Sequence, residues 1–216
     1  MSWTLAMTAP GKWRSVSAGE DRDAEIAAAI DEVFAKADRD SSAVDKHWMK
    51  QRLEGALDGV SEAGARVVSV AFPTQPVGGV VLPVTATVLA LETSSETMED
   101  ALKALAAVAA GDPSAQPIPT NAGLALRTHR VSDVKESFDA EVEHAPLEPE
   151  LRREIQAASS AVPMLRARYL FPAAGARQWH AVSFSATLAT DEPDLVTTYL
   201  ELFDAFAETV TWKQQS

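Results

Sequence analysis

The chain has 216 residues, no cysteine and a formal net charge of −12 from 31 acidic and 19 basic residues. This length is typical of one domain that buries enough apolar surface to fold without a disulfide or a metal. The lack of cysteine excludes disulfides, iron–sulfur clusters and thiolate zinc sites, and the absence of any Lys/Arg run argues against a nucleic-acid partner.

The first twenty residues predict extended structure. Trp3, Leu5 and Met7 alternate with smaller or polar residues, and a Pro-Gly turn then leads to a second extended segment with Trp13 and Val16. We therefore expect the chain to begin in a sheet.

The opening residues also lack the basic and then apolar segments of a signal peptide. The longest apolar stretch, 77–91, is interrupted by glycine and proline and is too short for a membrane helix. We expect a cytoplasmic protein with no membrane insertion.

Residues 22–37 and 42–63 predict a helical hairpin, because apolar residues recur at helical spacing in both ranges. Ser42 is the expected N-cap of the second helix, with Asp45 three residues later. The first stripe comprises Ile26, Ile30, Val33, Phe34 and Ala37, and the second comprises Met49, Leu53, Leu57 and Val60.

The next segments predict a β-hairpin and a helix. Residues 66–72 are rich in β-branched side chains and 79–92 alternate along their length, so the two should pair antiparallel. Residues 97–110 should be helical, with Thr97 as the N-cap, Asp100 at the capping-box position, and an apolar series of Met98, Leu102, Leu105 and Ala109.

Residues 122–131 predict a strand, and 132–160 form an acidic insert whose only expected element is a short helix at 149–159. Residues 164–171 and 179–187 predict a second β-hairpin. A long C-terminal helix follows, with a wide apolar stripe that should pack across one face of the sheet. The stripe comprises Leu195, Tyr199, Leu202, Phe203, Phe206 and Val210.

This order of elements predicts an α+β class for one domain over 1–216. We expect an antiparallel sheet flanked by helices, because adjacent strands joined by short turns favour antiparallel pairing.

The sequence contains little that indicates catalysis or metal binding. The four histidines do not have metal-ligand spacing, and we interpret the cluster Asp139, Glu141, Glu143 and His144 as an exposed acidic loop. His180 should point to the sheet face opposite Ser183 and Ser185, because strand side chains alternate. We therefore expect no catalytic residue, no metal site and no cofactor.

Two residues of the helical hairpin are candidates for an interface. His47, Trp48 and Met49 are consecutive, and helical positions are rotated by about 100°, so they cannot all face one core. His47 or Trp48 should therefore be exposed, and we predict that they contact a protein partner. Self-association of the chain is another option.

Both ends of the chain carry a pattern found in a known fold. The segment RARYLFPAAGARQWHAVSFSATLATDEPDLVTTYLELFDAFAETVTW and the opening LAMTAPGKWRSV resemble the closing hairpin and helix, and the first strand and turn, of PsbP-like domains. This fold is shared by the photosystem II extrinsic protein, a Ran-binding nuclear-import factor and some bacterial lipoproteins. The resemblance implies a protein-binding role and transfers no functional residue.

These observations lead to three hypotheses. The first is a non-enzymatic protein-interaction module, such as an accessory or scaffold subunit of a bacterial assembly. The second is a carrier of a small apolar ligand with a helix-grip fold, which keeps a cavity under its last helix. The third is an enzyme whose paired carboxylates are distant in sequence.

Overall fold

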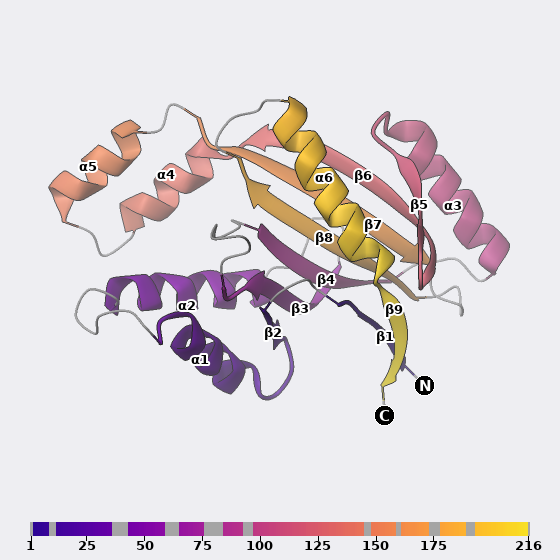
Figure 1. Ribbon diagram of the computed structural model, residues 1–216, viewed down its shortest axis with the longest axis horizontal. Helices are drawn as coiled ribbons and strands as arrows, with labels where there is room; N and C mark the ends of the chain where they lie inside the picture. The colour runs from indigo at the N-terminus through magenta and orange to yellow at the C-terminus, as the bar shows by residue number, and fades with distance from the viewer. Residues whose placement is uncertain are drawn as a thin grey trace.

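The computed structural model describes residues 2–8, 12–35, 43–58, 65–75, 84–92, 97–144, 148–158, 161–172, 178–188 and 193–215. Within these ranges the chain forms nine strands and six helices (Figure 1). None of the helices in them is long and apolar enough to cross a membrane. The elements are β1 (Ser2–Ala6), β2 (Trp13–Ser17), α1 (Arg22–Val33), α2 (Ala43–Asp58), β3 (Arg66–Pro73), β4 (Val84–Glu92), α3 (Met98–Gly111), β5 (Gln116–Thr120), β6 (Gly123–Asp133), α4 (Lys135–His144), α5 (Pro149–Ala158), β7 (Pro163–Pro172), β8 (Gln178–Thr187), α6 (Pro193–Glu208) and β9 (Thr211–Gln215).

Seven strands form one antiparallel sheet in the order β2-β3-β4-β8-β7-β6-β5. The predicted α+β class with an antiparallel sheet is confirmed. The two predicted β-hairpins pair as β3 with β4 and β7 with β8, and β4 also pairs with β8 across the centre of the sheet. Ser42 and residues 79–83 lie outside the described residues.

The two ends of the chain form a separate antiparallel ribbon of β1 and β9, with Leu5 opposite Trp212. The sequence pattern predicts no strand after the last helix. The helix ends at Glu208, whereas Val210 lies beyond it and is fully buried. The indole N–H of Trp212 donates to the Ala122 carbonyl at 3.0 Å, which anchors the ribbon to the turn between β5 and β6.

Helix α6 covers one face of the seven-stranded sheet (Figure 1). Phe184 of β8 stacks on Phe203 at a centroid separation of 4.8 Å and lies 5.7 Å from Phe206. Tyr169 of β7 meets the same Phe184 ring edge-on at 5.6 Å. Aromatic side chains therefore fill the space between α6 and the centre of the sheet.

The opposite face is covered in two places by other helices. Ile26 and Ile30 of α1 and Leu53 and Leu57 of α2 are buried together over β2 and β3. Helix α3 packs at the far end of β7, near β6 and β8, through Ala101 and Leu105, which cluster with Leu126 and Trp179. The middle of this face, along β8 and β7, lies between the two helical layers.

Helix α3 begins at the predicted cap but buries a different face. The Thr97 hydroxyl accepts from the Asp100 N–H at 3.1 Å and donates to its carboxylate at 2.7 Å. Met98 and Leu102 are 40% and 51% exposed, so the predicted apolar series is only partly buried. The contact is made through Ala101, whose small side chain lets the helix approach the sheet closely.

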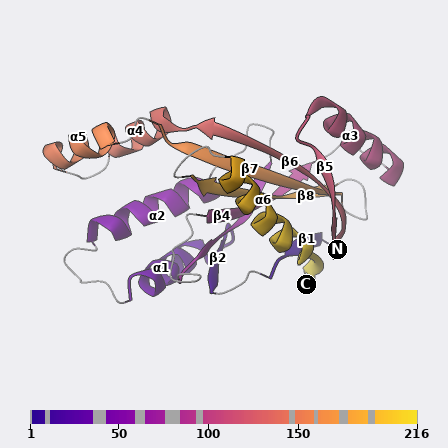
Figure 2. The same cartoon turned by 45° about the horizontal axis from the view of Figure 1, so that its top comes forward.

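The acidic insert is largely helical. Helices α4 and α5 pack on each other and extend beyond the end of the sheet, at the side away from α3 (Figures 1 and 2). Lys135 joins the two helices by donating to the Asp139 carboxylate at 2.9 Å and to the Gln156 carbonyl at 3.1 Å. The sequence pattern does not define the state of residues 132–148, of which 132–133 belong to β6 and 135–144 form α4.

Burial of His180 predicts a pH-dependent stability. The ring is 2% exposed and meets Trp212 edge-on at 5.3 Å. Burial, followed by the charge of Arg66, lowers the pKa of His180. The unfolded chain, with an imidazole pKa of about 6.5, thus takes up the proton more readily than the folded chain.

We therefore expect the melting temperature to fall as the pH drops from about 7 to about 5, because protonation favours the unfolded state. A His180→Phe variant should show a shallower decline in the same window. His47→Gln, at an exposed position, is the control and should follow the wild type. Equal slopes for all three proteins in a thermal-melt series would contradict this assignment.

Candidate binding site

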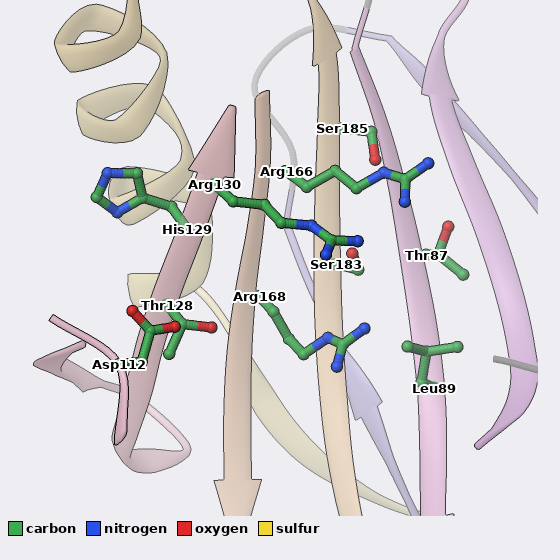
Figure 3. A pocket seen from close by; sticks show the side chains of 10 residues that line it. All are labelled: Thr87, Leu89, Asp112, Thr128, His129, Arg130, Arg166, Arg168, Ser183 and Ser185. Atoms are coloured by element: carbon green, nitrogen blue, oxygen red, sulfur yellow. The ribbon is translucent and has the colours of Figure 1, made fainter. Parts of the chain in front are cut away.

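A groove lies on the face of the sheet opposite α6, in the part that the helices leave uncovered. It consists of a basic pocket of about 420 Å³ and an apolar pocket of about 580 Å³, and both are open to solvent. The two pockets share Thr87 and Ser185 on their walls, so they adjoin. The basic pocket is lined mainly by Arg130, Arg166, Arg168, Thr87, Ser183 and Ser185 (Figure 3).

Strand alternation explains why polar side chains gather here. Leu165 and Ala167 of β7 are fully buried toward α6, so Arg166 and Arg168 stand on the other face and are exposed. On β8, Phe184 is buried on the α6 side, and Ser183 and Ser185 face the groove. One face of the same two strands thus builds the core while the other builds the pocket.

The strand register brings the arginines together. Arg130 of β6 is directly opposite Arg166 of β7, and Arg168 is directly opposite Ser183 of β8. Figure 3 shows the three arginine side chains extending in one direction over β8, toward Thr87 on β4. Like charges directly opposite on neighbouring strands destabilise a sheet, so this pair is unfavourable without a counter-charge.

No carboxylate of the described residues forms an ion pair with these three arginines. Asp112 lies on the pocket wall, but its Oδ1 accepts from the hydroxyl and the N–H of Ser114 at 2.7 and 2.9 Å. These hydrogen bonds hold the pKa of Asp112 below its usual range. The positive charge of the pocket is therefore left without an ionic partner in the described structure.

The histidines do not supply a base to the pocket serines. The His129 ring points away from the arginines (Figure 3), and burial lowers its pKa, with Arg127 adding to the effect. His180 lies on the α6 side of β8, with its ring against Trp212, whereas Ser183 and Ser185 line the groove, as the alternation predicts. Within the described residues, the geometry is suited to binding an anion and offers no histidine to activate a serine.

The apolar pocket lies between α2 and the sheet. Its walls combine helix residues with strand residues that belong to the neighbouring core, and two methionines are among them. Methionine adapts readily to different apolar partners. The main apolar lining residues are Phe34, Met49, Leu53, Phe72, Val84 and Met164.

His47, one of the two predicted interface candidates, lies on the other side of α2 from the apolar pocket. His47 is exposed and lines a shallow hollow between α1 and α2 together with Lys46 and Glu54. Met49 is half-buried and faces the apolar pocket. The side chain of Trp48 lies outside the described residues. The His47 and Trp48 interface therefore stays a prediction.

The acidic cluster does not assemble into a metal site within the described structure. Asp139 pairs with Lys135, and Glu143 is exposed, whereas the side chains of Glu141 and His144 are outside the described residues. The part of the chain that is described contains no group of three His, Asp or Glu side chains arranged to hold a metal ion.

Sequence reasoning missed the arginine cluster. Its signal was local: Arg166 and Arg168 occupy alternate positions between residues that are buried in β7. The contribution of Arg130 depends on the pairing of β6 with β7, which the sequence does not reveal. Comparison with protein-family models and with curated proteins finds no match to this chain.

Proposed function

We propose that this protein is a non-enzymatic interaction module, an accessory or scaffold subunit that holds a segment of another protein in the groove. The observation that carries this proposal is the open, uncovered sheet face with three exposed arginines that have no ionic partner among the described residues. Burying the partner's carboxylates against these arginines supplies the missing counter-charge.

The shape of the groove favours a protein segment over a sequestered small ligand. Ligand-carrying cavities commonly bury 70% or more of the ligand surface, whereas both pockets here are open to solvent. A helix-grip carrier also needs space beneath its last helix, and Phe203 and Phe206 occupy that position. The resemblance to PsbP-like domains, whose members mostly bind other proteins, supports the same proposal.

The proposal is tested by capturing the partner with purified protein from native lysate, followed by reciprocal capture with the protein identified. We expect the double variant Arg166→Gln/Arg168→Gln to lose the partner while melting at or above the wild-type temperature. Lys103→Gln/Lys213→Gln removes the same charge from exposed sites outside the groove and is the matched control. It should retain the partner.

The same capture with Trp48→Ala tests the hairpin prediction. Loss of the partner in this variant alone would move the interface to α1 and α2, because truncating an anchoring Trp commonly weakens binding by 2 kcal/mol or more. A partner confirmed in both directions and retained by both variants would contradict an interface at either surface.

A further inference from the structure

We infer that the groove binds a short extended peptide in which acidic residues adjoin apolar ones, with carboxylates over Arg130, Arg166 and Arg168 and apolar side chains in the pocket beside α2. This inference rests on the proposed function and specifies the chemistry of the partner segment. The occupant is identified from the charge and the shape of the two adjoining pockets.

The acidic half follows from the opposed arginines. Arg130 and Arg166 face each other across β6 and β7, and Arg168 is two residues further along β7. A guanidinium binds a carboxylate through two parallel hydrogen bonds, and an anion between two guanidiniums turns their repulsion into attraction. The hydroxyls of Thr87, Ser183 and Ser185 lie on the same face and provide further donors.

The apolar half follows from the continuity of the groove. Beyond the shared Thr87 and Ser185, the walls become apolar, with Met164 on β7 and Met49 on α2. Thr187 lies four positions after Ser183 on β8, a distance of about 13 Å at roughly 3.3 Å per residue. An extended peptide of only a few residues can therefore contact both pockets.

The charge of the whole protein favours a peptide over a larger polyanion. A membrane or a nucleic acid presents a broad negative surface, and the whole protein, with its net charge of −12, repels such a surface. A narrow peptide contacts the three arginines and comes close to few of the protein's acidic residues. The positive charge is confined to the groove, so the negative charge of the bound segment should also be confined to a few residues.

The test begins with selection from a random peptide library displayed on phage, with wild-type protein as bait. We expect the enriched peptides to place Asp or Glu next to Leu, Ile or Phe. The best peptide, synthesised with a fluorescent label, is then titrated with each variant by anisotropy at low and at physiological salt. Its affinity should fall as the salt concentration rises.

Three variants separate the two halves of the site. Arg130→Gln/Arg166→Gln should weaken peptide binding at least about tenfold, because it removes charge-assisted hydrogen bonds to the peptide carboxylates. Met164→Gln keeps the side-chain size and should lower the affinity for the peptide by a smaller factor. Lys103→Gln/Lys213→Gln should bind within about twofold of the wild type, as removing rim or distant charge changes affinity little.

Stability gives a readout that a purely structural role of the arginines would not give. In the absence of peptide, Arg166→Gln should raise the melting temperature by roughly 1–3 °C, because it removes the repulsion from Arg130. The same variant should lose binding. A lower melting temperature with binding retained would show that the arginine supports the fold instead of the site, and would overturn the inference.

The inference is overturned if no peptide is enriched, if the enriched peptides lack acidic residues, or if they bind the Arg130→Gln/Arg166→Gln variant equally well. Binding to phosphatidylserine vesicles as tight as binding to the peptide would assign the groove to a membrane and overturn the inference. Concentration-dependent self-association that is lost in the same variant would assign the groove to a second copy of the chain and overturn it as well. If peptides fail but partner capture still requires Arg166 and Arg168, the proposed function stands and only the peptide chemistry is wrong.

Discussion

Replacing Phe206 by alanine is expected to lower the free energy of unfolding by about 3–5 kcal/mol. Phe206 is 1% exposed, and its ring lies 5.0 Å from Trp13 and 5.7 Å from Phe184 between centroids. Removing the ring leaves a cavity between α6 and the sheet. Urea titration followed by tryptophan fluorescence measures the loss, and Trp13 reports directly on the site.

Two other positions on α6 calibrate this result. Glu201→Ala, on the exposed face, should leave the unfolding free energy within about 0.5 kcal/mol of the wild type. Leu202→Asp should destabilise the protein less than a charge at Phe203 would. Leu202 is half-buried, so the introduced carboxylate can reach solvent. Identical unfolding curves for all of these proteins would mean that α6 is not docked.

Removing Asp204 should destabilise the protein by a similar amount, about 3–5 kcal/mol, because it leaves a buried charge without a partner. The Asp204 carboxylate accepts from the guanidinium of Arg127, a residue that is 6% exposed, and from the Tyr169 hydroxyl at 2.6 Å. Burial, followed by the bond to Asp204, raises the pKa of Tyr169 well above its usual value. Arg127 also donates to Gln116 on the edge strand β5, so the network joins α6 to three strands.

Chemical denaturation of Asp204→Ala measures this effect, and Asp58→Ala is its control. Asp58 pairs with Arg22 at 2.5 Å on the surface, where solvent screens the ion pair and its removal should change stability little. The double variant Arg127→Met/Asp204→Leu should recover much of the lost stability, since it removes both charges. An Asp204→Ala variant no less stable than Asp58→Ala would contradict the importance of the network.

The elements that the sequence predicted well are those with a strong local pattern. The apolar stripe around Phe203 and Phe206 predicted α6, and Thr97 with Asp100 predicted the start of α3. The element β9 was missed because five residues after a helix carry too short an alternation to identify a strand. Its stability comes from pairing with β1, about 200 residues away, and no local pattern records such a contact.

The groove was missed for a related reason. The composition described the average charge, which is strongly negative, and hid a local excess of positive charge on one sheet face. Arg130 and Arg166 become neighbours only because β6 pairs with β7 in one particular register. The apolar pocket likewise depends on where α2 lies relative to β3 and β4. Both are properties of the tertiary arrangement.

The ribbon formed by β1 and β9 affects how the protein is made. Residues 2–6 leave the ribosome about 200 residues before their partner strand, residues 211–215, is synthesised. At roughly 5–20 residues per second, β1 waits on the order of 10–40 s for β9. During that time the backbone donors and acceptors of β1 are available to other chains. A chaperone that shields β1 during this interval should therefore raise the yield of folded protein.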